Sequence, residues 1–261
     1  MPFSHVAARH PRIQSCIAPP PGMVVVEGRW AHRLLLDVSA AVDTVLWCPE
    51  LGGDASLARA VARTAGAAFE VSARTMERVT HRRRGGGLAS LVRLPRWGFD
   101  ASRFGPDALV LIADGVEYAG NLGTLIRTVD ACGGAALALT NRRARVDAAA
   151  VFTASRGTVL TTPVLEFDSV EAAARWCRAG GFVVHLASPA ADTTYRDGSF
   201  AGRTAIVVGS EGEGIGPAWF EHPHSLVSIP MRGRADSLNV AVAAAVLMFA
   251  AAGGVESHSP D

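Results

Sequence analysis

The sequence contains no lysine, and all 25 of its basic residues are arginine. Codon bias in a GC-rich genome is the ordinary explanation of such a composition. Arginine binds phosphate through two parallel N–H donors, so a chain without lysine keeps the means to bind nucleic acid. The missing lysine therefore does not count against a nucleic-acid partner.

Long apolar runs are also missing. No stretch reaches the roughly 18–20 residues that a bilayer-spanning helix needs, and we interpret the longest, alanine-rich Ala241–Val255, as a buried core helix. The first residues include no compact apolar segment of the kind found in secretion signals. With 49% hydrophobic and 19% charged residues, the composition is that of an ordinary globular protein. We therefore expect a cytoplasmic protein with no membrane attachment.

Cysteine is scarce, and no CxxC pair occurs among Cys16, Cys48, Cys132 and Cys177. This spacing indicates buried thiols in a reducing cytoplasm. His222 and His224 lie close together but have no partners at metal-ligand spacing. We therefore expect a surface loop at the two histidines and no metal site.

Charge is distributed unevenly along the chain. Residues 1–100 hold 13 arginines against 8 acidic residues, whereas residues 101–261 hold 12 against 16. The segment His81–Val92 places Arg82, Arg83 and Arg84 beside three glycines and predicts a cationic loop. Such a loop is either a solvated run of charges or a loop that binds RNA phosphates, and composition leaves both interpretations open.

Alternating strand and helix patterns over residues 1–94 predict a small α/β domain. We expect residues 1–20 to be a loose arm. Strands are expected at Met23–Glu27, Thr44–Cys48 and Ala67–Val71, and helices at Trp30–Leu36, Ser56–Thr64 and Arg74–Val79. Residues 95–107 contain two prolines and two glycines, so we interpret them as a linker.

Residues 108–255 predict a second α/β domain. Strands are expected at Ala108–Ala113, Ala135–Thr140, Phe182–Leu186, Ile206–Val208 and Leu226–Ile229, and helices at Ala148–Thr153, Val170–Ala179 and Ala241–Ala252. Their alternation predicts a mainly parallel sheet covered on both faces.

Two polar stretches of this second domain are candidate site residues. Asn121 is expected to cap a helix, and Arg127 lies six residues further on, away from the apolar stripe of that helix. Arg127 is then either an ordinary surface residue or a residue that borders the same cavity as Asn121. Near the C-terminus, four glycines follow the strand Ile206–Val208, and a loop without Cβ atoms brings its backbone close to a ligand. Further on, Ser237 is expected to cap the final helix.

Three blocks now stand in order along the chain: Asn121-x-Gly-x-x-x-Arg127, Gly209-Ser210-Glu211-Gly212, and Ile229-Pro230-Met231 with Ser237-Leu238-Asn239-Val240. Their order and spacing resemble the three motifs of the SpoU/TrmH family of RNA ribose 2′-O-methyltransferases, in the SPOUT superfamily. Ser155-Arg156-Gly157 before Pro163-Val164 resembles the members that methylate ribosomal RNA and give thiopeptide resistance. The N-terminal domain resembles the ribosomal-protein-like RNA-binding domain that many members carry.

This resemblance implies a C-terminal SPOUT domain with a deep trefoil knot that binds S-adenosylmethionine as methyl donor. It implies a homodimer with the site near the subunit interface, and it implies no metal. The cofactor-binding residues are then Leu186, Ala187, Gly209, Ser210, Gly212, Ile229, Met231, Ser237 and Leu238. The catalytic residues are Arg127, Asn121, Glu211, Ser237 and Asn239, and the RNA-binding residues are Arg82, Arg83, Arg84 and Arg156.

The family places the arginine that matches Arg127 at the 2′-OH, with a proposed role as base. Arginine hardly deprotonates in proteins. We therefore expect Arg127 to orient the phosphate and to stabilise developing alkoxide charge. Asn121 and Asn239 would fix Arg127 and the ribose, and Glu211 would orient this cluster.

Other functions remain open at this point. A dinucleotide site would need a GxGxxG sequence after the first strand of its domain, which is not the order found here. A non-catalytic RNA-binding protein on the same fold and a methyltransferase acting on a small molecule are the stronger alternatives. The basic N-terminal half favours a macromolecular anion, and we favour ribosomal over transfer RNA.

Overall fold

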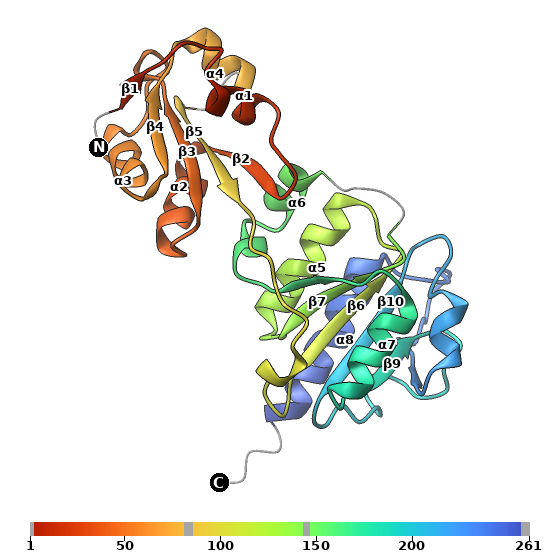
Figure 1. Cartoon of the computed structure of the whole chain (residues 1–261). Coiled ribbons are helices and arrows are strands. Elements are labelled where there is room, and N and C mark those ends of the chain that lie inside the picture. Colours follow the sequence, from red (N-terminus) through yellow and green to blue (C-terminus); the bar gives the residue numbers. More distant parts are fainter. Residues whose placement is uncertain (1–2, 81–85, 143–146, 257–261) are drawn as a thin grey trace. The chain divides into compact units, whose positions relative to one another are not determined.

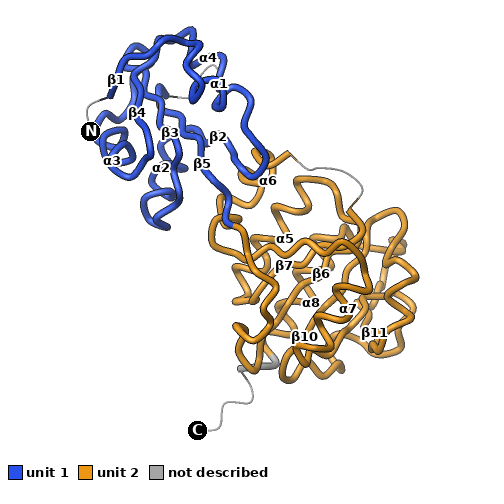
Figure 2. The backbone as a smooth tube through the Cα atoms, in the orientation of Figure 1, with its two compact units in different colours: residues 1–95 blue, residues 96–261 orange. Residues whose placement is uncertain are grey.

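The computed structural model describes residues 3–80, 86–142 and 147–256 of the 261-residue chain. The chain forms two compact units, Met1–Pro95 and Arg96–Asp261 (Figure 2). Each unit has its own sheet with helices around it, which confirms the α/β class that the sequence predicts (Figure 1). Within the described ranges, no helix combines the length and the apolar character that crossing a membrane requires.

Unit 1 is built on a five-stranded mixed sheet with the strand order β1-β4-β3-β5-β2. Its strands are β1 (Ser4–His5), β2 (Met23–Glu27), β3 (Val42–Trp47), β4 (Ala67–Glu70) and β5 (Leu88–Arg93), and β5 is antiparallel to both of its neighbours. Its helices are α1 (Pro11–Ile17), α2 (Gly28–Asp37), α3 (Ala55–Thr64) and α4 (Ala73–Val79), with a short 3-10 helix at Pro49–Leu51. The expected strands and helices of this unit are therefore confirmed.

Strand β5 corrects the expectation of a loop over His81–Val92. Five of its six residues are buried, because Leu88, Leu91 and Val92 pack in the interior of the sheet. Burial of that apolar surface decides the extended conformation. The three predicted RNA-binding residues Arg82–Arg84 lie outside the described residues.

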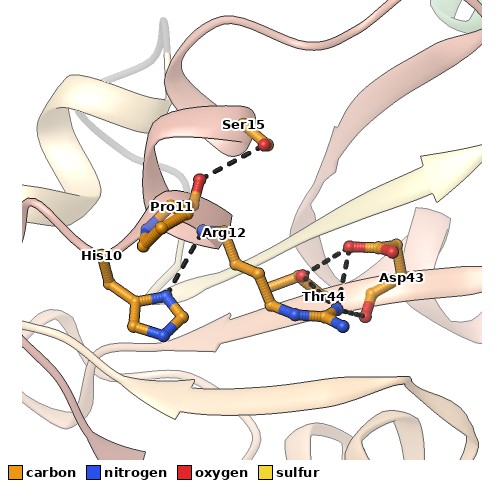
Figure 3. Close-up of polar contacts among 6 residues, drawn as sticks. All are labelled: His10, Pro11, Arg12, Ser15, Asp43 and Thr44. Atoms are coloured by element: carbon orange, nitrogen blue, oxygen red, sulfur yellow. Dashed lines mark hydrogen bonds and ion pairs between the residues drawn. The ribbon is translucent and has the colours of Figure 1, made fainter.

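The first twenty residues are not a loose arm, which corrects a second expectation. Helix α1 buries Ile13 and Cys16 in the core of unit 1. Arg12 fixes the same helix to the start of β3, because its Nη1 donates to the carbonyl and the carboxylate of Asp43, each at 3.1 Å, and to Thr44 Oγ1 at 3.4 Å (Figure 3). These contacts join segments that are 31 residues apart in the chain.

All four cysteines are free thiols. Cys16, Cys48 and Cys177 are buried, as the sequence predicts, whereas Cys132 is half-buried. Burial raises the pKa of the Cys16 and Cys177 thiols to about 12, and the nearby Asp43 carboxylate adds to the rise at Cys16. These two thiols therefore stay protonated and unreactive at neutral pH.

Unit 2 contains a six-stranded sheet in which every pair of neighbouring strands is parallel, with the order β11-β9-β10-β6-β7-β8. The strands are β6 (Leu109–Asp114), β7 (Ala136–Thr140), β8 (Val164–Glu166), β9 (Val183–Ala187), β10 (Thr204–Gly209) and β11 (Ser225–Val227). The helices are α5 (Ala119–Ala131), α6 (Ala148–Ala154), α7 (Val170–Ala179) and α8 (Val240–Glu256), with short 3-10 helices at Ala101–Arg103, Thr158–Leu160 and Pro217–Glu221. The predicted parallel sheet is confirmed.

Helices cover both faces of this sheet. Trp176 and Cys177 of α7 pack with Val110 and Val207 of the central strands on one face. Helices α5 and α8 contact each other on the opposite face, where α8 also contacts β6 and β10 (Figure 1). The pairing of strands does not decide whether the chain is knotted, so the trefoil knot stays a prediction from resemblance.

We interpreted residues 95–107 as a linker, but all of them after Pro95 belong to unit 2. Trp97 and Phe104 pack against its core, and the Trp176 indole donates a hydrogen bond to the carbonyl of Phe99. The Arg203 guanidinium donates to the carbonyls of Phe104 and Gly105. The stretch therefore contributes directly to the packing of unit 2.

Helix α8 is less buried than its composition predicts. Ala244, Leu247 and Met248 face the core, but Val242 is 50% exposed and Phe249 is 53% exposed. An apolar helix with one uncovered face corrects the expectation of a fully enclosed helix. The uncovered face is a candidate for a contact with another chain.

Candidate active site

The predicted residues of the glycine loop and of the segments after β9 and β11 lie at the carboxyl edge of the unit 2 sheet. Parallel strands all end at this edge, and the register pairs Asp114 of β6 with both Gly209 of β10 and Thr140 of β7. At the other side, Ala187 of β9 pairs with Val227 of β11. The segments that follow β9, β10 and β11 therefore leave the sheet side by side, which is where open α/β sheets bind ligands.

The glycine loop after β10 is a tight turn that needs its glycines. A Cβ at Gly209 would lie 2.0 Å from the carbonyl carbon of Gly214, so no side chain fits there. Gly214 has a φ of +68°, which favours glycine. Ser210 and Gly214 exchange two backbone hydrogen bonds of 3.2 and 3.0 Å that close the turn. The close approach of backbone to backbone explains the need for glycine at position 209, and the expected approach of the loop to a ligand stays a prediction.

Asp114 holds the far end of this loop, and the sequence reasoning missed it. Its carboxylate is 2% exposed, and Oδ2 accepts a hydrogen bond from the Gly216 N–H at 2.7 Å. Oδ1 accepts from Thr140 Oγ1 at 2.7 Å and from Asn141 Nδ2 at 2.8 Å. The available signal was an acidic residue at the very end of an otherwise apolar strand, directly before Gly115.

Asn121, Glu211 and Asn239 form one hydrogen-bonded cluster, although they come from three separate motifs. Glu211 Oε1 accepts from Asn121 Nδ2 at 2.5 Å and from Asn239 Nδ2 at 3.0 Å. Asn239 Nδ2 also lies 3.3 Å from Asn121 Oδ1. The predicted proximity of these three residues is present in the structure.

The caps of the two helices differ from those expected. Helix α5 begins at Ala119, so its N-cap is Tyr118 and Asn121 lies inside the first turn. This frees the Asn121 side chain for Glu211. Helix α8 begins at Val240 and is capped by Asn239, whose Oδ1 accepts from the Ala241 N–H at 3.0 Å.

Ser237 is therefore not the cap of α8. Its hydroxyl donates to Asp236 Oδ1 at 3.2 Å, and its side chain is exposed to solvent. The structure does not bring Ser237 into hydrogen-bonding contact with the other predicted catalytic residues. It lies two residues before Asn239, on the segment that leads into α8.

Arg127 lies on the exposed side of α5, as the apolar stripe of that helix predicts. Leu122, Leu125, Ile126 and Val129 are buried, whereas the Arg127 side chain faces solvent. Among the residues that the structure describes, Arg127 makes no hydrogen bond or ion pair. The structure therefore leaves its five N–H donors available to a ligand.

Arg156 lies beside the same helix. Gly123 of α5 has no room for a Cβ, which would lie 2.4 Å from the Ala154 Cβ and 2.6 Å from the Ser155 nitrogen. The end of α6 therefore packs directly on α5, one turn before Arg127. Arg156 follows in the left-handed conformation, with φ of +53°, and is exposed.

The predicted cofactor residues differ in what they can present to a ligand. Leu186 is 0% exposed within the core on the α7 face of the sheet. Ala187, Gly209, Ser210, Ile229 and Met231 are half-buried at the carboxyl edge, and Gly212 and Leu238 are exposed there. The edge thus combines open backbone of the glycine loop with apolar side chains from the segment after β11. Across the described ranges, no group of three or more histidine, cysteine, aspartate or glutamate residues is placed to hold a metal ion.

These features define a class of protein. Residues 108–249 match the model of the SpoU rRNA Methylase family, and the chain belongs to this family. The family resemblance inferred from the three motifs is therefore confirmed.

Curated relatives match about half of this chain. An uncharacterized tRNA/rRNA methyltransferase of Mycolicibacterium vanbaalenii is 37% identical over 142 residues, which cover 54% of this chain and 45% of that protein. A 23S rRNA (guanosine-2′-O-)-methyltransferase, RlmB, of Haemophilus influenzae is 34% identical over 143 residues and 58% of its length. The chain thus matches about half the length of these relatives.

Solved structures resemble the whole chain. The crystal structure of an RNA 2′-O ribose methyltransferase is 29% identical, with a TM-score of 0.75, and covers 97% of this chain and 99% of its own. AviRb of Streptomyces viridochromogenes, solved with AdoMet, covers 96% of this chain and 100% of its own, with a TM-score of 0.83 at 24% identity. The second likeness, at 24% identity, concerns the fold alone, and it extends over both units.

Proposed function

We propose that this protein transfers a methyl group from S-adenosylmethionine to a ribose 2′-OH of RNA, with ribosomal RNA favoured over transfer RNA. The observation that carries the proposal is the Asn121–Glu211–Asn239 cluster at the carboxyl edge, next to the helix that exposes Arg127. Family membership and the names of the relatives support the same reaction. The choice of ribosomal RNA rests on the Ser155-Arg156-Gly157 segment, and a role in antibiotic resistance stays a prediction from resemblance.

The carboxyl edge suits S-adenosylmethionine. A Cβ at Gly212 would meet no atom within 4 Å, so the backbone of the glycine loop borders open space. Leu238, on the segment that leads into α8, is 36% exposed. Ile229 and Met231, after β11, are half-buried. Backbone polar groups together with apolar side chains match an adenosine and a methionine chain. When bound, the cofactor would supply an electrophilic methyl group.

Arg127 would act on the RNA. A guanidinium keeps its proton at any pH that the protein meets, so it binds the phosphate beside the target ribose and stabilises negative charge that develops on the 2′ oxygen. Arg156, close to the same helix, would hold a neighbouring phosphate. Sequence-independent contacts of this kind position the RNA backbone.

The cluster would position the ribose. Glu211 accepts from both asparagine amides and so fixes their orientation. Asn239 uses its whole amide within the cluster and the cap of α8, whereas Asn121 keeps one Nδ2 N–H that would be presented in a set geometry. Orientation of the 2′-OH toward the methyl group supplies much of the rate in such a displacement.

The test is methyl transfer from labelled S-adenosylmethionine to ribosomal RNA and, separately, to transfer RNA, followed by digestion to nucleosides. We expect a labelled 2′-O-methylnucleoside from ribosomal RNA. Arg127→Ala is expected to lower transfer by about 100-fold or more while cofactor binding changes little. Arg178→Ala, an exposed arginine of α7, is the matched control.

Two outcomes contradict the proposal. Intact cofactor binding without label in either RNA pool would indicate a small-molecule substrate. If the unmodified protein does not bind S-adenosylmethionine, it would be a non-catalytic RNA-binding protein. Near-normal transfer by Arg127→Ala would refute the role of this side chain alone.

The protein would act as a homodimer in the cytoplasm. Val242, half-buried Val246 and Phe249 recur at the spacing that forms one helix face, and this face of α8 is apolar and uncovered. Light scattering after size-exclusion chromatography measures the oligomeric state. Phe249→Asp is expected to yield monomers, whereas Leu51→Asp, an equally apolar surface position in unit 1, should leave the dimer intact.

A further inference from the structure

Tyr118 is an exposed aromatic residue at the start of the helix that carries Arg127. It is the N-cap of α5, and 72% of its surface is exposed. Its carbonyl accepts the Leu122 N–H at the start of the helix, but its hydroxyl makes no hydrogen bond among the described residues. Single exposed aromatics are common on protein surfaces, and exposure alone therefore means little. What distinguishes Tyr118 is its position at the start of α5.

The Tyr118 ring lies against Gly120. A Cβ on Gly120 would lie 2.6 Å from Cε1 and 3.1 Å from Cζ of the ring, so a larger residue there would displace the ring from the first turn of α5. The ring is thus placed by the backbone of the helix while most of its surface stays open. A ring held in this way loses little conformational entropy when a ligand stacks on it.

Gly120 and Arg127 lie on the same face of α5. Seven residues make two turns of a helix, so the two positions are aligned and separated by about 10 Å along the axis. Thr124, between them, is exposed. Side chains of a helix point toward its N-terminus, so Arg127 extends in the direction of the ring. The ring and the guanidinium therefore border one open strip.

We propose that Tyr118 is a stacking platform for a nucleobase of the RNA substrate, adjacent to the ribose that is methylated. Single-stranded RNA is bound through unpaired bases that stack on aromatic side chains, together with cations that hold the phosphates. The strip on α5 offers both groups. This inference rests on the proposed function, because it assigns the nucleotide next to Arg127.

The experiment compares Tyr118→Ala, Tyr118→Phe and Gly120→Ala in the intact protein, with the ribosomal RNA pool as probe. Tyr118→Ala is expected to raise the KM for RNA, and the Kd of the RNA in filter binding, by about 5- to 100-fold, the range for losing one base–aromatic stack. Tyr118→Phe should stay within about twofold, since the ring remains. Gly120→Ala should fall in between, because it displaces the ring without removing it. The Kd of S-adenosylmethionine should not change.

Salt dependence separates stacking from phosphate contact. Tyr118→Ala should weaken RNA binding by the same factor at every salt concentration, whereas Arg156→Ala should also reduce the slope of log K against log salt. An unchanged Kd for Tyr118→Ala would overturn the proposal. So would an equal loss in Tyr118→Phe, or a changed oligomeric state of Tyr118→Ala.

The two proposals fail in different ways. If the unmodified protein binds RNA without methylating it, the proposed reaction is wrong, and the Kd values still decide the role of Tyr118. If the unmodified protein methylates RNA and Tyr118→Ala binds RNA with the same Kd, only the stacking platform is wrong. If it neither binds nor methylates RNA, both are wrong.

Discussion

The buried carboxylate of Asp114 accepts a hydrogen bond from the backbone N–H of Gly216, with 2.7 Å between Oδ2 and the nitrogen. The two residues are 102 positions apart in the chain. This bond joins the end of β6 to the end of the glycine loop, whose middle carries Glu211. Asp114 thereby helps to set where Glu211 meets Asn121 and Asn239.

Asp114→Asn is expected to destabilise unit 2 and to weaken cofactor binding. Three donors converge on the carboxylate, so an amide in its place must direct its own N–H groups at one of them. An unsatisfied buried donor costs about 1–3 kcal/mol of unfolding free energy. Chemical denaturation measures this loss, with Asp130→Asn on the exposed side of α5 as control. Equal stability of the two variants would contradict the role of Asp114.

Asn239 has two roles that substitution can separate. Its Oδ1 caps α8, and its Nδ2 donates to Glu211. Asn239→Ser is expected to keep the cap and lose the amide donor, so methyl transfer should fall at least about tenfold while the melting temperature is kept. Asn239→Ala loses both and should also cost about 1 kcal/mol of stability. Transfer by Asn239→Ser at the unmodified rate would show that the cluster is only structural.

Gly209 and Gly212 are expected to respond differently to the same substitution. A Cβ at Gly209 overlaps the backbone of Gly214, whereas a Cβ at Gly212 meets nothing within 4 Å. Gly209→Ala should therefore lower stability by about 1–3 kcal/mol and displace the loop. Gly212→Ala should unfold at the same temperature as the unmodified protein. Thermal unfolding decides, and equal shifts would show that the loop is mobile enough to absorb either change.

Unit 1 is expected to lose stability in acid because of His32. Its Nδ1 lies 2.7 Å from the Gly28 carbonyl and its Nε2 lies 2.9 Å from Ser90 Oγ, and burial lowers its pKa to about 4. The carbonyl can only accept, so Nδ1 carries the proton and Nε2 accepts from the serine hydroxyl.

The sign of the effect follows from the lowered pKa. Between about pH 6.5 and pH 4 the unfolded chain binds a proton at His32 that the folded chain does not, so stability falls as the pH falls. The loss is on the order of 2–3 kcal/mol between pH 7 and pH 4.5. Urea unfolding at both values should show a smaller dependence for His32→Gln than for the unmodified protein. His5→Gln, at an exposed site, is the control and should retain the full dependence.

Local patterns were sufficient for most elements. Val170–Ala179 is a helix with the predicted bounds, because Ser169 caps it and its apolar residues recur at helical spacing. Central strands such as β6 were visible as short apolar runs. Helix α1 was not predictable, because its seven residues carry little periodicity and are held by Arg12 contacts with Asp43, a distant residue.

The candidate site was predictable in its residue types but not in its contacts. The motif order indicated Asn121, Glu211 and Asn239, and the structure joins them by hydrogen bonds. Ser237 was expected as a cap because serine favours that position, but α8 begins later and selects Asn239. A shift of two residues at a helix start is decided by the surrounding fold, and sequence preference alone does not resolve it.

The sequence by itself determined the α/β class, the parallel sheet and the family, since these follow from apolar periodicity and from motif order. Only the tertiary structure decided that Asp114 holds the glycine loop and that α8 leaves an apolar side uncovered. The physical reason is distance along the chain. Periodicity reports on neighbours within a helix or strand, whereas a hydrogen bond or a close contact between remote residues exists only after the sheet has brought them together.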